Sequence, residues 1–206
     1  MTSSVRLVTI AIGLAALTGG QLSAQTPPQA PSAASAKKPV LKKQRLGSIK
    51  QVHALGDIYL TGQPTPDDLA LLKGHGIKTI ISLRHTKELP WDEATAVRQH
   101  GMRFVHVPFQ GPEQLKTETF DKVLKALRDK KRGPTVLHCG SANRVGAMWY
   151  AYRILDGKID PDAAAKEAKT AGLRNPKYLE KAQAYVKRQK ESGDQVQASQ
   201  GPSAGN

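Results

Sequence analysis

The segment Val136–Met148 reads VLHCGSANRVGAM and contains the residue types needed for chemistry on a tetrahedral anion. Its thiol, Cys139, is the single cysteine of the 206-residue chain and stands between an apolar strand pattern and a helix pattern. A thiolate attacks phosphorus or sulfur, and positive surroundings favour that ionised form. Cys139 is therefore the candidate nucleophile.

Small residues follow the cysteine and form a candidate anion cradle. Backbone N–H groups of a short loop at a helix N-terminus can point at an anion, and the helix dipole also favours negative charge. Arg144 comes next, and its planar guanidinium can hold two oxygens of the anion at once. We expect Arg144 to clamp the anion. The residues expected to line the cradle with their backbone are Gly140, Ser141, Ala142, Asn143 and Val145.

This segment resembles the signature of cysteine-dependent protein tyrosine and dual-specificity phosphatases, in which His-Cys, a glycine-containing loop and an arginine follow in order. The Cys-x4-Arg spacing is similar to that of a bacterial phosphatase-like family also found fused to beta-lactamase-like hydrolases. Its upstream Gly-Gln-Pro-Thr turn and Leu-Arg strand end are matched by Gly62–Thr65 and Leu83-Arg84. Over about Val52 to Val186, the resemblance implies a phosphatase fold. It also implies hydrolysis of phosphomonoesters, such as those of tyrosine, serine and threonine, through a phosphocysteine.

The resemblance also implies supporting residues. The histidine before the cysteine, here His138, supports the loop through hydrogen bonds and helps to keep the thiolate ionised. Protonation of the leaving oxygen needs a general acid, which the family places in a loop upstream of the cysteine, usually as an aspartate. The matching loop, Pro108–Gln114, has no aspartate. Glu113 is therefore the candidate acid, with Asp92 and Glu93 in reserve.

Two departures from the family pattern predict slow turnover. Related loops have glycine where Ala142 stands, and glycine reaches backbone conformations that alanine adopts only at a cost. Many related enzymes have serine or threonine after the arginine, where a hydroxyl helps to break down the phosphocysteine; Val145 has none. Two other functions stay open. The Cys-x4-Arg loop has one amide fewer than the usual phosphatase loop, and rhodanese-like sulfurtransferases use short loops to carry a persulfide, here on Cys139. A phosphoryl-binding module without catalysis is the other alternative.

The elements that must position these residues alternate between short apolar runs and helix patterns. This alternation predicts an α/β fold with a mostly parallel sheet of about four or five strands flanked by helices. The expected strands cover residues 57–60, 78–83, 103–107 and 135–138. Helices are expected from Thr65-Pro66, over 90–100, from Thr117, after the cysteine loop, and from Asp160-Pro161 and Asn175-Pro176. The helix after the loop shows one apolar stripe, formed by Val145, Met148, Tyr152 and Leu155.

The first residues have the pattern of a secretory signal peptide, with Arg6 before an apolar run from Leu7 to Leu17 and a cleavage site after Ala24. We therefore expect residues 1–24 to be removed and the mature protein to be periplasmic or secreted. Residues 25–50 are basic and rich in Pro, Ala, Ser and Gln, which predicts a disordered linker. The phosphatase-like domain is expected over 51–190, with a disordered tail over 191–206.

The formal net charge of +14 bears on partners. The basic linker could hold the protein near an anionic membrane surface. Nucleic acid is not expected, because few aromatic residues lie between the basic residues and the chain carries an export signal. The histidines lack the spacing of metal ligands, so we expect neither a metal site nor a cofactor. The expected partner is a phosphorylated protein or a small phosphomonoester.

Overall fold

A six-stranded sheet forms the centre of the computed structural model, which describes residues 39–199. The strands are β1 (Lys42–Lys43), β2 (His53–Leu55), β3 (Ile58–Thr61), β4 (Thr79–Ser82), β5 (Arg103–His106) and β6 (Thr135–His138). Their order is β1-β2-β3-β6-β4-β5; β3, β6, β4 and β5 are parallel, and β1 and β2 are antiparallel additions. The predicted α/β fold with a mostly parallel sheet is confirmed. The sheet has six strands rather than four or five, because the expected set omitted β1 and β2.

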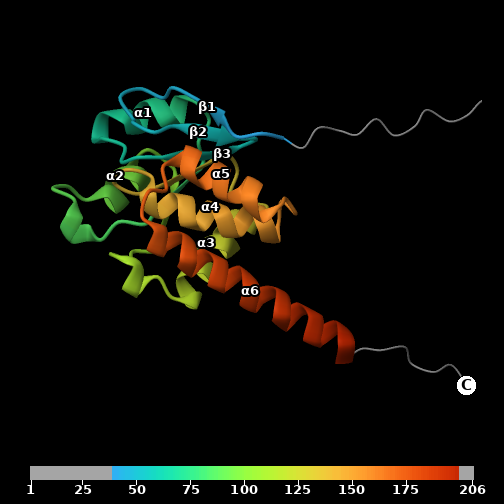
Figure 1. Cartoon of the computed structure of the whole chain (residues 1–206). Helices are drawn as coiled ribbons and strands as arrows, with labels where there is room; N and C mark the ends of the chain where they lie inside the picture. Colours follow the sequence, from blue (N-terminus) through green and yellow to red (C-terminus); the bar gives the residue numbers. More distant parts are fainter. Residues whose placement is uncertain (1–38, 200–206) are drawn as a thin grey trace, which may run out of the picture. The chain divides into compact units, whose positions relative to one another are not determined.

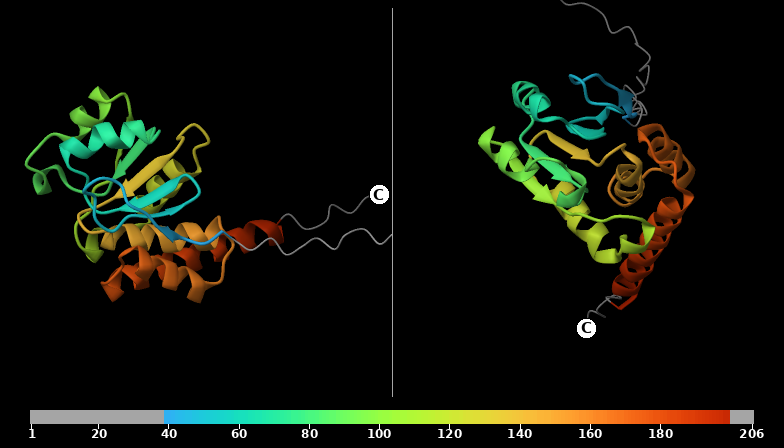
Figure 2. Two further views of the ribbon diagram at one scale, coloured as in Figure 1. Left: turned by 90° about the horizontal axis from the view of Figure 1, so that it is seen from above. Right: turned by 90° about the vertical axis from the view of Figure 1, so that its left-hand side faces the viewer.

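Helices cover both faces of the sheet (Figures 1 and 2). The two on one face are α1 (Pro66–Gly74) and α2 (Glu93–Gln99). The other face carries α3 (Thr117–Arg128), α4 (Asn143–Leu155), α5 (Pro161–Ala171) and α6 (Pro176–Ser199). Short 3-10 helices, η1 (Thr86–Glu88) and η2 (Pro112–Gln114), lie in the connections after β4 and β5. Among residues 39–199, no helix has both the length and the apolar character needed to cross a bilayer.

Alternating residues of the central strands point into two separate cores. Ile80 and Val136 pack under α1 and α2, whereas their neighbours Ile81 and Leu137 pack under α3 and α4. All four are fully buried. This is the pattern of parallel strands that are covered on both faces, which read as continuous apolar runs in the sequence.

Five of the six predicted helix starts agree with the structure, whereas α2 begins at Glu93 and not at residue 90. Thr65 caps α1 and forms a capping box with Asp68. Asp160 accepts hydrogen bonds from the first backbone N–H groups of α5. The predicted stripe of Val145, Met148, Tyr152 and Leu155 packs in the core, but other faces of the helix are buried as well, because α4 lies between the sheet and the helices α5 and α6. It is therefore buried on nearly all sides, including at Trp149 and Tyr150.

Two boundaries also differ from the prediction. Residues 39–50 were expected to belong to a disordered linker, but β1 pairs with β2, and Leu41, Leu46 and Ile49 are buried. These apolar residues lack a regular period, because Leu41 packs in the core under α3 and α4, whereas Leu46 and Ile49 pack in the core under α1 and α2. Residues 191–199 continue α6, because elongating a helix that is already docked fixes only one more residue per hydrogen bond. Residues 1–38 and 200–206, including the predicted signal peptide, lie outside the described residues.

Candidate active site

Cys139 follows the last residue of β6, the strand that β3 and β4 flank. The carboxyl ends of parallel strands meet at one edge of a sheet, where ligands of α/β proteins bind. On one side, the Gln63 N–H donates to the Gly140 carbonyl (3.3 Å), and on the other the Leu83 N–H donates to the His138 carbonyl (3.0 Å). The two upstream motifs noted in the sequence therefore adjoin the cysteine loop.

The cysteine loop turns into α4 through a strained residue. Ala142 has φ 60° and ψ 4°, the left-handed conformation that costs a residue with a side chain roughly 1–2 kcal/mol. Its methyl group is fully buried, and a Cβ added to Gly172 would lie 2.8 Å from it. The prediction that position 142 needs a backbone conformation which alanine adopts only at a cost is confirmed. This turn places the first N–H groups of α4, which have no partner inside the helix, at the loop.

Asn143 contributes to the loop in a way that the sequence did not indicate. Its side-chain oxygen accepts hydrogen bonds from the backbone N–H groups of Arg174 (2.8 Å) and Asn175 (3.2 Å). Its amide side chain therefore fastens the connection between α5 and α6 to the cysteine loop.

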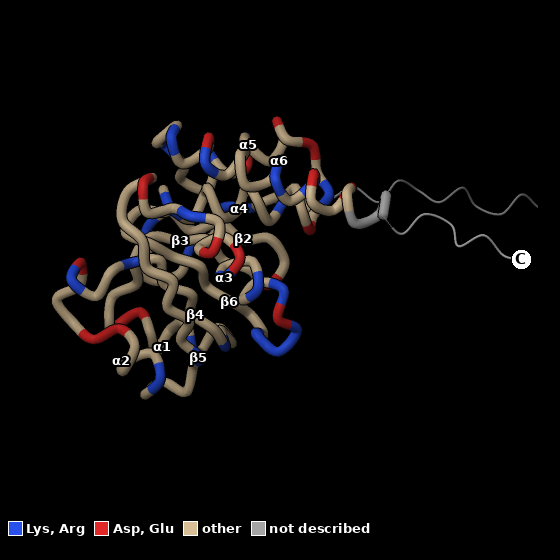
Figure 3. The backbone as a smooth tube through the Cα atoms, turned by 90° about the horizontal axis from the view of Figure 1, so that it is seen from below, with Lys and Arg blue, Asp and Glu red and all other residues tan. Residues whose placement is uncertain are grey.

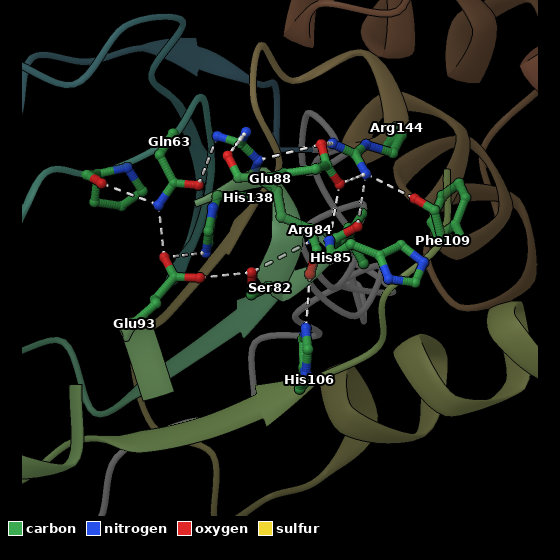
Figure 4. A network of polar contacts seen from close by, with 12 residues as sticks. Gln63, Ser82, Arg84, His85, Glu88, Glu93, His106, Phe109, His138 and Arg144 are labelled. Atoms are coloured by element: carbon green, nitrogen blue, oxygen red, sulfur yellow. Dashed lines mark hydrogen bonds and ion pairs between the residues drawn. The ribbon is translucent and has the colours of Figure 1, made fainter. Parts of the chain in front are cut away.

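Arg144 is held in one orientation by a carboxylate and two carbonyls (Figure 4). Its Nη1 donates to Glu88 Oε1 (2.9 Å), and its Nη2 donates to Glu88 Oε2 (2.7 Å), which makes a bidentate pair. Nη1 also donates to the carbonyls of Leu83 (2.9 Å) and Phe109 (2.6 Å). These contacts fix the guanidinium from the side opposite its Nε atom.

The remaining edge of the Arg144 guanidinium is available to an anion. A guanidinium has five N–H donors, and the four contacts above use those of Nη1 and one of Nη2. The Nε–H and the second Nη2–H lie along one edge, which is the geometry that binds two oxygens of a tetrahedral anion. Burial acts against the charged guanidinium, but Glu88 and the nearby Cys139 sulfur raise the pKa of Arg144. The clamp and the nucleophile therefore share one site.

Glu88 is the functional residue that sequence reasoning missed. The Arg144 pair, outweighing partial burial, lowers the pKa of Glu88 from its ordinary 4.5 to about 2, with help from the His85 N–H and from Arg84. Glu88 lies four residues after Arg84, and its Oε2 is 3.4 Å from Arg84 Nε. The segment between them contains the short 3-10 helix η1 and no α-helix, so the sequence had no helix pattern that indicated this contact. Glu88 is ionised at any pH where the enzyme would be assayed.

We expect Glu88→Gln to loosen the Arg144 clamp, because glutamine cannot form a charged bidentate pair with the guanidinium. The kcat/KM for an aryl phosphate should fall about tenfold. The variant should also lose about 2 kcal/mol of unfolding free energy at pH 7, after allowance for partial exposure. Urea titrations and initial-rate kinetics would measure both effects.

The pH dependence gives this prediction its control. The Glu88 pKa is lower in the folded state, so its stabilisation is fully present above pH 4.5 and is lost as pH falls toward about 2. The stability gap between wild type and Glu88→Gln should therefore narrow between pH 4.5 and 2. Glu191→Gln, at the exposed end of α6, should show neither effect. A gap of the same size at pH 7 and pH 2.5 would contradict the charged pair.

His138 lies behind the cysteine in a fully buried position beside Glu93. Its Nε2 is 3.2 Å from Glu93 Oε1, an ion-pair distance without the angles of a linear hydrogen bond. Glu93 also accepts from Gln63 Nε2 (2.6 Å) and Ser82 Oγ (2.8 Å) (Figure 4). Burial disfavours its charge, but these partners, His138 first, hold the pKa of Glu93 below its ordinary value. The cluster supports the loop from behind, and Gln63 and Glu93 are part of that support.

Arg84 joins this cluster to the Arg144 clamp. Its Nη1 donates to Gln63 Oε1 (3.3 Å), and its Nη2 donates to the Glu88 carbonyl (2.7 Å). A Cβ added to Gly140 would lie 3.9 Å from the Arg84 guanidinium. The strand-end arginine noted in the sequence therefore lies beside the cysteine loop.

The structure does not bring a predicted general acid to the loop. Glu113, in η2, is exposed and borders a pocket of about 390 Å3 with Lys181 and Arg188 of α6; no residue of the cysteine loop lines that pocket. Asp92 caps α2, and hydrogen bonds from Thr95 lower its pKa. Glu93 is ionised in the His138 cluster. Asp92 and Glu93 therefore have structural roles, because a general acid must carry a proton at the operating pH.

Val145 lies in the first turn of α4, and its side chain is fully buried in the core. Only its backbone N–H can therefore face the cysteine loop.

Within residues 39–199, no group of three or more His, Cys, Asp or Glu side chains has the arrangement of a metal site. Basic residues occur on several helices and connections, interspersed with acidic ones (Figure 3).

Comparisons with known proteins agree with this geometry. A family model described as DSP-PTPase phosphatase fused to NAD+ kinase matches residues 32–189. The dual specificity protein phosphatase TpbA of Pseudomonas aeruginosa (strain UCBPP-PA14) is 26% identical over 186 residues, which cover 89% of this chain and 79% of TpbA.

Solved structures share the fold. The crystal structure of P. aeruginosa TpbA superposes with a TM-score of 0.58 at 23% identity, covering 75% of this chain and 92% of TpbA. A TpbA Cys→Ser variant in complex with pTyr gives 0.58 at 21% identity, over 74% and 91%. The DUF442 structure from Shewanella putrefaciens CN-32 gives 0.60 at 23% identity, over 69% and 95%. The chain belongs to the DSP-PTPase phosphatase family and is a phosphatase of the tyrosine and dual-specificity type.

Proposed function

We propose that this protein is a metal-independent phosphatase that hydrolyses phosphomonoesters, among them phosphotyrosine, phosphoserine and phosphothreonine, through a phosphocysteine on Cys139. One observation carries the proposal: Glu88 and two carbonyls hold the Arg144 guanidinium so that its free edge shares a site with the cysteine. Family membership favours phosphoryl transfer over the sulfurtransferase chemistry that the short loop alone left open.

In the proposed mechanism, the Cys139 thiolate attacks phosphorus in line with the ester oxygen. The phosphorus–sulfur bond forms as the phosphorus–oxygen bond breaks, and the leaving oxygen takes the electron pair of that bond, departs as a phenolate or alkoxide and takes its proton from water. Arg144 and the loop N–H groups bind the three equatorial oxygens, whose charge is greatest in the transition state. A water molecule then attacks phosphorus, which releases phosphate and returns the electron pair to sulfur.

The leaving group is expected to depart without help from Glu113, because this carboxyl borders the α6 pocket instead of the loop. Glu113→Gln should change kcat/KM by less than about twofold for aryl and alkyl phosphates alike, whereas a general acid contributes 10²–10⁴-fold. The kcat/KM of wild type should fall steeply as the pKa of the leaving group rises. Steady-state kinetics over a series of substituted phenyl phosphates and one alkyl phosphate would measure both. A large loss confined to the alkyl phosphate would restore Glu113 as the acid.

Mass spectrometry of rapidly quenched protein would test the proposed intermediate. After brief exposure to 4-nitrophenyl phosphate, the peptide that contains Cys139 should carry one phosphoryl group. After exposure to thiosulfate it should be unmodified. A persulfide without a phosphoryl adduct would show a sulfurtransferase, and neither adduct despite phosphate binding would show a binding module.

Two observations support the substrate and the location. The solved complex of TpbA with pTyr supports phosphotyrosine as one substrate. The apolar run from Leu7 to Leu17 supports an exported, periplasmic or secreted protein. N-terminal sequencing of the mature protein tests the second point, and a first residue at Gln25 is expected. Contact of the basic N-terminal segment with an anionic membrane stays a prediction from the sequence.

A further inference from the structure

A second arginine, Arg174, lies on the cysteine loop from the connection between α5 and α6. Its Nη2 donates to the Ser141 hydroxyl (2.8 Å) and to the Ser141 carbonyl (3.3 Å). Its backbone N–H is held by Asn143 Oδ1 (2.8 Å). Arg174 is therefore fixed at its backbone and at its side chain by two residues of the loop itself.

Arg174 is an exposed residue. The contacts with Ser141 use Nη2, so the structure describes no partner for Nε and Nη1 within residues 39–199. The connection of residues 172–175 and the first turn of α6 contain no acidic residue, and Lys177 in that turn is a second exposed cation. An arginine fixed at one nitrogen loses little further side-chain entropy when its free donors bind an anion.

The clamp for the phosphoryl group is complete without Arg174. Arg144 and the start of α4 supply the bidentate donors and the N–H groups that one tetrahedral dianion needs, and Arg144 is itself fixed by Glu88. Arg174 adds positive charge beside Ser141, at the exposed rim of the same loop. Its donors are therefore placed for a different group of the substrate.

We propose that Arg174 is a specificity-determining residue that binds a carboxylate next to the phosphorylated residue, so that the enzyme prefers phosphopeptides with acidic flanks. This inference rests on the proposed phosphatase function. The free Nε–H and Nη1–H donors lie on different edges of the guanidinium, so a carboxylate oxygen binds through one of them as a charge-assisted hydrogen bond. An exposed ion pair of this kind contributes a modest preference. Arg174 acts on substrate choice, whereas Cys139 and Arg144 act on the reacting group.

The test uses the full-length protein and three synthetic phosphotyrosine peptides of equal length, with glutamate, glutamine or lysine on both sides of the phosphorylated residue. Wild type should hydrolyse the acidic peptide with a kcat/KM about three- to fivefold above that of the glutamine peptide, and the lysine peptide more slowly still. Arg174→Ala should bring the acidic-to-glutamine ratio to within twofold. Arg188→Ala, on the outer part of α6, is the matched control and should keep the wild-type ratio.

The ratio separates a binding role from a structural one. If Arg174 only braced Ser141, its loss would slow all three peptides equally and leave the ratio unchanged, which would overturn the inference. Arg174→Lys keeps the charge and should retain part of the preference, and about 0.5 M salt should weaken it, because the pair is exposed.

Other outcomes also decide the question. Equal rates on the three peptides with wild type would overturn the specificity inference while leaving the phosphatase intact. No hydrolysis of any peptide by wild type would instead overturn the proposed function. If Arg174→Ala weakened inhibition by tripolyphosphate but left the peptide ratio unchanged, the rim would serve a second phosphoryl group, and the peptide assignment would be wrong.

Discussion

Replacing Cys139 by serine should reduce the hydrolysis of 4-nitrophenyl phosphate by about 10⁴-fold or more, the scale of loss when a covalent nucleophile is removed. Serine has nearly the same shape, but its hydroxyl is scarcely ionised at neutral pH. The described structure offers no base beside it, since Glu88 and Glu93 are both engaged as ionised partners. Steady-state kinetics with freshly purified variant would measure the loss.

Binding should survive the same substitution, because the Arg144 clamp and the loop N–H groups do not depend on the sulfur. Inorganic phosphate should therefore bind Cys139→Ser with an affinity similar to that of wild type in a calorimetric titration. Wild-type activity should persist in excess chelator. Hydrolysis that survives the loss of the thiol, or that disappears on chelation, would refute the cysteine mechanism.

Arg144→Lys should lower kcat/KM roughly 150-fold, which corresponds to a loss of about 3 kcal/mol of transition-state stabilisation. The reason is that a fixed bidentate donor becomes a single mobile ammonium group. Lysine would lose the paired contacts with Glu88 and would not reproduce the bonds to the carbonyls of Leu83 and Phe109. Most of the loss should appear in kcat, since the charge on the equatorial oxygens is greatest in the transition state.

Folding must be checked in parallel, because the Arg144 contacts also join three connections of the domain. A thermal denaturation curve would show whether Arg144→Lys remains folded under assay conditions. Glu88→Gln keeps the arginine and removes only the carboxylate that orients it. The kcat/KM of this variant should therefore lie between those of wild type and Arg144→Lys. A folded Arg144→Lys variant with less than a tenfold loss would exclude Arg144 as the clamp.

The sequence by itself located the candidate nucleophile, the candidate clamp and the elements around them, because these features are local. Cys139 and Arg144 lie in one short segment, and a strand pattern, small residues and a helix pattern follow each other there. The caps Thr65 and Asp160 also act on backbone groups within three residues. Such signals need no knowledge of the fold, so β6 and the starts of α1, α3, α5 and α6 were predicted at their observed positions.

Only the tertiary structure decided which side chains complete the site, because their contacts join segments far apart in the chain. Glu88 meets Arg144 across 56 positions, and Arg174 meets Ser141 across 33. Glu93 looked like a spare acid, yet burial against His138 gives it a structural role. Glu113 stands in the expected loop, but η2 places it toward α6. Residue type and spacing identify a candidate carboxyl group in the sequence. Its protonation state and the orientation of its side chain depend on the residues that pack around it.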